Sequence, residues 1–196
     1  MKNLSKLAYL ALFIASGTFV TSCSDDDNAV DAPMEPTSLY AKLGGTTKVA
    51  DPNNPGQMIE QGRLSYRSVV DSTITLIVSD AITDAPGNLS AHFAPVLSEA
   101  LSGNTTNVAI LSKNLTDFFS ANTGGGATNT YSGLNMVKTH DPAQNPRMGK
   151  KINDTEYDKF IGYIGQSAGL NGVTDPMLIG EVVDVLESLR APIVQE

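Results

Sequence analysis

The sequence lacks most of the residues that build the commoner functional sites. It contains no tryptophan, one cysteine and two histidines among 196 residues. A lone cysteine cannot form an internal disulfide, and no zinc-ligand spacing or nucleophile elbow occurs. The glycine run 124–126 is not followed by Lys and Ser or Thr, so it does not match a phosphate-binding loop. These absences leave a histidine, His140, as the main candidate for chemistry.

The N-terminus has the pattern of an export signal. Lys2 and Lys6 precede an almost unbroken, uncharged apolar run over residues 7–20. The run is shorter than the roughly 20 residues that a membrane-spanning helix needs, and small residues follow it. A buried core helix would show a polar face, which this run lacks. We therefore predict a secretory signal peptide over residues 1–22.

The single cysteine, Cys23, follows this run directly. The segment Val20-Thr21-Ser22-Cys23 resembles the bacterial lipobox, whose cysteine is acylated after cleavage, although Val20 stands where leucine is usual. Residues 24–28 (Ser-Asp-Asp-Asp-Asn) resemble the acidic tract of some Gram-negative lipoproteins that reach the outer face of the outer membrane, or belong to a solvated tether. We predict lipidation at Cys23 and an acidic flexible tether over 23–37. We also predict attachment to the outer membrane of the cell envelope, on its surface or periplasmic face, through the lipid anchor alone.

The charge balance argues against a nucleic-acid partner. The full chain has 13 basic and 21 acidic residues and a net charge of −8. Removal of residues 1–22 takes away two of the basic residues and none of the acidic ones, so the net charge becomes about −10. Such a surface repels phosphates of nucleic acids and anionic lipid headgroups.

Apolar residues beyond the tether recur with helical spacing, which predicts an all-α domain without strand pairing. Residues 66–82 are rich in β-branched side chains, but their length and their lack of strict alternation favour a helix over a strand. The first predicted helix runs from Leu39, is capped by Thr37 or Ser38 and ends at Gly44-Gly45. A helix over 66–82, a short and loosely helical connection over 89–97, a helix capped by Asn107 and a helical turn over 133–140 follow. The last two helices begin with an Asn153/Glu156 capping box and at Asp175-Pro176.

The order of the segments around His140 strengthens the prediction that it is a functional residue. Residues 38–45 (Ser-Leu-Tyr-Ala-Lys-Leu-Gly-Gly) resemble the opening of the group I truncated haemoglobins, and residues 131–140 (Tyr-Ser-Gly-Leu-Asn-Met-Val-Lys-Thr-His) resemble the run that ends in their proximal histidine. Residues 154–160 and 182–190 are similar to the two closing helices. The resemblance spans most of residues 38–193 and implies a globin-like, 2-on-2 helical fold with loop insertions.

The resemblance also implies a set of cofactor contacts. Its cofactor is haem b (iron protoporphyrin IX), and His140 corresponds to the ligand that binds the haem iron from the proximal side. A neutral imidazole binds iron through one ring nitrogen while the other donates a hydrogen bond that fixes the ring. The other expected haem contacts are apolar: Phe93, Val78, Leu111, Leu115, Phe119 and Met136. In a haem-free bundle the same residues would be ordinary core.

Departures from the family pattern concern the distal side. Counting back from Asp84, Ile77-Val78 stand where the family has a Phe-Tyr pair, and Leu115 stands where a glutamine is frequent. We therefore expect a largely apolar distal pocket that holds O2 weakly and favours CO or NO. Two insertions also depart from the pattern, at 51–64 and 141–151, and the second directly follows His140. We do not expect His92 to be a second axial ligand, because it neighbours Phe93 and would point away.

Three functions stay open at this point. The leading hypothesis is a haem protein that binds a diatomic gas (O2, NO or CO) at the cell envelope. A haem-capture or carrier lipoprotein and a haem-free interaction module are the alternatives. No acid–base partner in the distal segment indicates an enzyme such as an NO dioxygenase or a peroxidase, so ligand binding is predicted over catalysis. The sequence identifies no reductase.

Overall fold

The computed structural model describes residues 37–196. The predicted signal peptide, the predicted lipidation site Cys23 and the tether up to residue 36 lie outside the described residues. Within the described range, no helix is both long and apolar enough to cross a membrane. The elements in chain order are α1 (Leu39–Lys42), β1 (Lys48–Ala50), β2 (Met58–Glu60), α2 (Gln61–Ile82), α3 (Ser90–Leu101), α4 (Thr106–Ser120), η1 (Ala121–Gly125), α5 (Met136–Thr139), α6 (Asp154–Leu170), α7 (Pro176–Ser188) and α8 (Arg190–Ile193).

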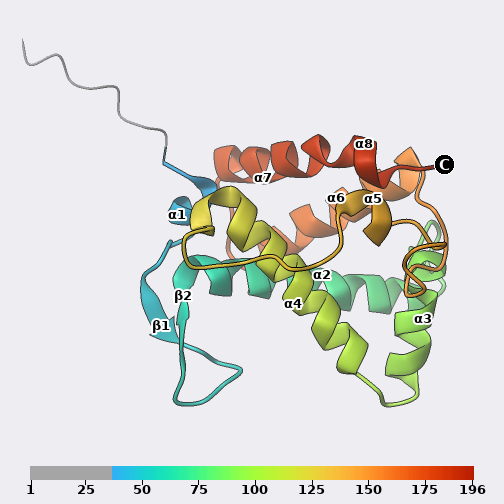
Figure 1. Ribbon diagram of the computed structural model, residues 1–196, viewed down its shortest axis with the longest axis horizontal. Coiled ribbons are helices and arrows are strands. Elements are labelled where there is room, and N and C mark those ends of the chain that lie inside the picture. The colour runs from blue at the N-terminus through green and yellow to red at the C-terminus, as the bar shows by residue number, and fades with distance from the viewer. Residues whose placement is uncertain (1–36) are drawn as a thin grey trace, which may run out of the picture. The chain divides into compact units, whose positions relative to one another are not determined.

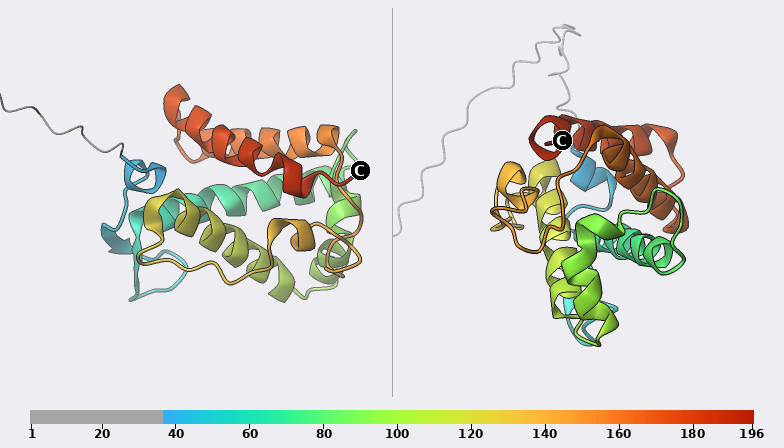
Figure 2. Two further views of the ribbon diagram at one scale, coloured as in Figure 1. Left: turned by 45° about the horizontal axis from the view of Figure 1, so that its top comes forward. Right: turned by 90° about the vertical axis from the view of Figure 1, so that its right-hand side faces the viewer.

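The described part of the chain is mostly helical, and the long helix α2 is its centre. Helix α2 packs extensively against both α4 and α6, and α6 in turn packs against α7 (Figure 1). In Figure 1, α6 and α7 lie above α2 and α4, while α3 stands at one end next to the loop before α6. The views in Figure 2 show the short helix α5 and its connecting segments running along α4. The prediction of a mainly α-helical domain is therefore confirmed.

The main core joins the first helices to the last ones. Its buried side chains come from α1, α2, α4, α6 and α7: Leu39, Tyr40, Tyr66, Val70, Phe119, Ile164 and Leu186. The ring of Tyr66 stacks between two others, with ring centroids 6.4 Å from Tyr40 and 5.6 Å from Phe119. Such aromatic pairs add to the free energy gained from burial alone. Together they fix α4, and with it one wall of the site described below.

The helix starts that the sequence predicts from local capping are confirmed. Ser38 accepts a hydrogen bond from the backbone N–H of Ala41, and Asn153 forms a full capping box with Glu156. Asp175 caps α7, whose first residue is proline. These ends are predictable because the cap side chain and the free N–H groups lie within three residues of each other.

Three details of the sequence prediction are wrong. Strands β1 and β2 form a small antiparallel hairpin in which Val49 pairs with Ile59, so strand pairing is present after all. The segment predicted as a loose connection is the regular 12-residue helix α3, although it contains Pro95. Helix α4 begins at Thr106 after Thr105, so Asn107 is not its N-cap. At the start of α4 a neighbouring residue takes the expected part of Asn107, because Asn104 Oδ1 accepts a hydrogen bond from the N–H of Thr106.

The close approach of α1 to α2 generates a first prediction. A Cβ atom added to Gly62 would lie 2.9 Å from the carbonyl oxygen of Tyr40, whereas one added to Gly162 in α6 would meet nothing within 4 Å. We expect Gly62→Ala to lower the free energy of unfolding by about 1–3 kcal/mol through overpacking. The matched change Gly162→Ala is expected to raise it by up to about 1 kcal/mol, because alanine favours a helix interior.

Urea unfolding of both variants beside the parent protein measures these changes. Equal stability of the two alanine variants would contradict the close packing of α1 on α2.

Candidate functional site

A largely apolar cleft of about 390 Å³ lies between α3, α4, α5 and the start of α6. Residues near the C-terminus, such as Leu189 and Ile193, complete its wall. The cleft volume lies in the range of small-molecule and cofactor sites, which are mainly apolar with a few placed polar groups.

Most of the side chains that the resemblance marks as haem contacts come together here. Six of the seven line this one cleft: Phe93, Leu111, Leu115, Phe119, Met136 and His140. They come from α3, α4, α5 and the residue that follows α5, so the cleft gathers side chains that are up to 47 residues apart in sequence.

Val78 is the exception. It lies on α2, is half-buried and is not among the lining residues. Its neighbour Ile77 belongs to a separate cluster with Leu89 and Tyr163. Leu89 itself lines the cleft, and so do Phe93 and Phe160, which pack on that cluster. This part of α2 is therefore linked to the cleft through these three side chains.

One ring nitrogen of His140 forms a hydrogen bond within the described residues, and the other forms none. Its Nδ1 lies 2.8 Å from the backbone carbonyl oxygen of Met136. A carbonyl only accepts, so Nδ1 carries the proton and donates it, and Nε2 keeps its lone pair. Among residues 37–196, Nε2 has no hydrogen-bond partner. The arrangement matches the usual form of a metal-binding histidine, in which the second nitrogen donates to a carbonyl.

Neighbouring segments hold the short helix that carries His140. Asn135 caps the helix by accepting a hydrogen bond from the N–H of Lys138. The amide of Asn145 donates to the carbonyl of Thr139 at 2.7 Å, and that of Gln195 donates to the carbonyl of Val137 at 2.8 Å. A four-residue helix has little stability alone, so these outside contacts set the position of His140.

The surroundings also favour the uncharged form of His140. Burial lowers its pKa, the hydrogen bond with Met136 opposes this, and the nearby His92 lowers it further. The net pKa lies below the ordinary value of 6.5. The imidazole is therefore neutral at physiological pH, which is the form that binds a metal ion.

His92 lines the same cleft with both ring nitrogens engaged. Its Nδ1 lies 3.2 Å from the carbonyl of Lys150, and its Nε2 lies 3.1 Å from a carboxylate oxygen of Glu156. The side chain is only 2 % exposed. Both ring nitrogens of His92 thus face acceptors. The side chain lines the cleft together with Phe93, so the expectation that it points away from the site is wrong.

Glu156 is a charged lining residue that sequence reasoning treats only as a helix cap. Burial alone would raise its pKa, but hydrogen bonds from Lys150, the Asn153 N–H and His92 lower it to about 2. The carboxylate therefore stays ionised in the cleft wall, where these hydrogen bonds stabilise its charged form. The capping box indicates its backbone role, but nothing local in the sequence indicates its contact with His92, 64 residues away.

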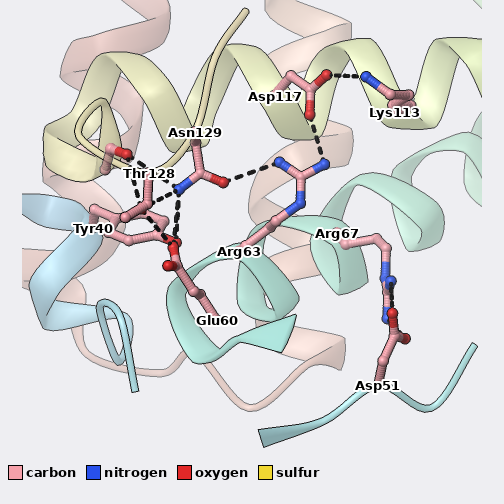
Figure 3. A network of polar contacts seen from close by, with 10 residues as sticks. Tyr40, Asp51, Glu60, Arg63, Arg67, Lys113, Asp117, Thr128 and Asn129 are labelled. Atoms are coloured by element: carbon pink, nitrogen blue, oxygen red, sulfur yellow. Dashed lines mark hydrogen bonds and ion pairs between the residues drawn. The ribbon is translucent and has the colours of Figure 1, made fainter. Parts of the chain in front are cut away.

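A second, polar cleft lies on the other side of α4, between that helix, α2 and the hairpin. Figure 3 shows the polar contacts around it, a network centred on Arg63, Asn129 and Glu60 and a separate pair of Arg67 with Asp51. Arg63 donates to Asp117 at 2.6 Å and to Asn129 at 3.1 Å, and the Asn129 amide donates to Glu60 at 3.0 Å. Arg67 binds Asp51 through two nitrogens. The charged groups in this network neutralise one another, and we interpret it as the attachment of the 51–64 insertion to the helices.

Comparison with known protein families finds no family model that matches this chain, and comparison with curated proteins finds no match. No group of three or more His, Cys, Asp or Glu side chains within residues 37–196 is arranged to hold a metal ion.

The polar network predicts an acid-sensitive component of stability. Burial alone would raise the pKa of Glu60, but hydrogen bonds from Tyr40, Thr128 and Asn129 and the contact with Lys48 lower it from 4.5 to about 2. A carboxylate with a depressed folded-state pKa stabilises the fold above its unfolded value and loses that contribution as pH falls. We expect Glu60→Gln to be less stable than the parent at pH 7, with the difference shrinking between pH 4.5 and about 2.

The control is Asp184→Asn, an exposed carboxylate of α7 that takes part in no ion pair of the described residues. Unfolding free energies measured across this pH range test the prediction. A difference between Glu60→Gln and the parent that is constant with pH would contradict it.

Proposed function

We propose that this protein is a haem-binding, globin-like lipoprotein of the group I truncated haemoglobin type, with His140 as the axial protein ligand of the iron. The supporting observation is that His140, whose Nε2 has no hydrogen-bond partner within residues 37–196, lines the same cleft as Phe93, Leu111 and Leu115. The helix pairs α2–α4 and α6–α7 are compatible with the two-over-two arrangement that the resemblance implies.

The residues present fit haem. A porphyrin supplies four of the iron's ligands, so one imidazole suffices as protein ligand and no cluster of side chains is required. The neutral state of His140, its carbonyl-bound Nδ1 and the apolar lining all suit this role. Bound haem would supply an iron atom able to take a diatomic gas as a further ligand.

The chain's own residues have separate tasks in this proposal. Leu111, Leu115 and Phe119 on α4 would bury apolar porphyrin surface and exclude water. Phe93 and Met136 would add further apolar contacts, and His140 would supply the nitrogen that binds the iron. At the envelope, the predicted lipid on Cys23 would hold the domain next to the membrane.

Gas binding is favoured over haem transport by the character of the α4 wall. Leucine, isoleucine and phenylalanine make up most of it, the amides of Asn107 and Asn114 are its polar members, and no ionisable residue of α4 lines the cleft. Transport stays an outcome of experiment: a carrier would pass haem to an apo-globin within minutes, whereas a gas-binding protein would retain it for hours.

Ligation by His140 is tested by chemical rescue. The parent protein is expected to give a Soret band on addition of haem, and His140→Gly is expected to lose the histidine-bound spectrum. Free imidazole should restore that spectrum, because it can occupy the space of the missing ring and supply the same nitrogen.

The control is Lys138→Gln, which changes an exposed side chain of the same helix and should leave the spectrum unchanged. A parental spectrum in His140→Gly without imidazole would contradict the assignment. A folded parent protein without any Soret band would contradict haem binding and favour a haem-free interaction module.

The apolar distal wall predicts rapid O2 release. A glutamine at position 115 would face the cleft and add a hydrogen-bond donor there. One such hydrogen bond contributes about 1 kcal/mol, so Leu115→Gln should slow O2 release from the haem-loaded, reduced protein roughly three- to tenfold. CO is less polar and serves as the internal control. Stopped-flow release that is already slow in the parent protein would contradict an apolar distal side.

A further inference from the structure

Arg147 differs from every other arginine in the described part of the chain. Arg63, Arg67 and Arg190 each form an ion pair with at least one carboxylate. The guanidinium of Arg147 forms no ion pair and no side-chain hydrogen bond within residues 37–196. It lines the apolar cleft while remaining exposed, so it lies at the rim.

The loop that carries Arg147 is firmly attached. Met148 is buried and lines the cleft beside it, and the N–H of Gly149 donates to the carbonyl of His92 at 2.8 Å. A Cβ atom at position 149 would lie 1.9 Å from the carbonyl oxygen of Ala91, so only glycine allows this approach. The rim position of Arg147 therefore follows from contacts on both sides of it.

No anionic lining group of the cleft neutralises Arg147. Glu156 is the acidic side chain among the lining residues. It forms an ion pair with Lys150 at 2.7 Å and contacts His92 at 3.1 Å. The cleft thus combines a large apolar interior with one uncompensated cation at its edge. A planar guanidinium offers paired donors that match a carboxylate.

We propose that Arg147 binds a carboxylate of the porphyrin at the rim of the cleft. This inference rests on the proposed function and deepens it, because it assigns the ligand class as a planar apolar macrocycle with an acidic edge. Arg147 lies within the 141–151 insertion, which thereby gains a role in ligand binding. The interaction does not depend on iron.

The test uses iron-free protoporphyrin IX and its dimethyl ester, whose carboxylates are blocked, titrated into the purified protein by fluorescence. We expect Arg147→Gln to weaken binding of the free acid roughly three- to tenfold and to leave the ester unaffected, as for a partly exposed charge-assisted contact. The matched control is Lys151→Gln, which removes the same charge from an exposed position of the same loop that does not line the cleft.

The outcomes separate this inference from the proposed function. If Arg147→Gln binds the free acid as the parent does, or weakens acid and ester equally, the carboxylate contact is overturned while haem binding stands. An equal loss in Lys151→Gln would also overturn it, because a general charge effect would then suffice. A parent protein that binds neither porphyrin would overturn both proposals.

Discussion

The hydrogen bond from His140 Nδ1 to the carbonyl of Met136 is the interaction on which the site depends. It fixes the tautomer and leaves Nε2 with its lone pair. The helix that carries it has only four residues, so its position comes from elsewhere. Asn145 and Gln195 hold it from the following loop and from the C-terminus, which couples the site to the closing helices.

Local signals in the sequence predict much of the fold. The caps at Ser38, Asn153 and Asp175 act within three residues, so their helices begin where the sequence indicates. The hairpin is missed because its strands have three residues each and depend on the attachment of the insertion to α2 through Asp51 and Arg67. Such long-range contacts leave no periodic pattern.

The candidate site, like the fold, is predictable from the sequence only in part. The apolar stripe on α4 and the i, i+4 spacing of Met136 and His140 are visible in the sequence, and these side chains line one cleft. Val78, which the count back from Asp84 predicts as a contact, lies on α2 and does not line the cleft. The sequence does not indicate the roles of Glu156 and Arg147. Glu156 contacts the buried His92, and the loop of Arg147 is attached through Gly149 to the backbone of His92; both contacts form only on folding.

The central claim is that the imidazole of His140 binds iron through Nε2. An anomalous-difference map at the iron absorption edge, from crystals of the haem-loaded protein, tests it most directly. The account predicts one strong peak about 2 Å from Nε2, on the cleft side of the ring, with Nδ1 still bonded to Met136. A peak placed beyond bonding distance of His140 would contradict it.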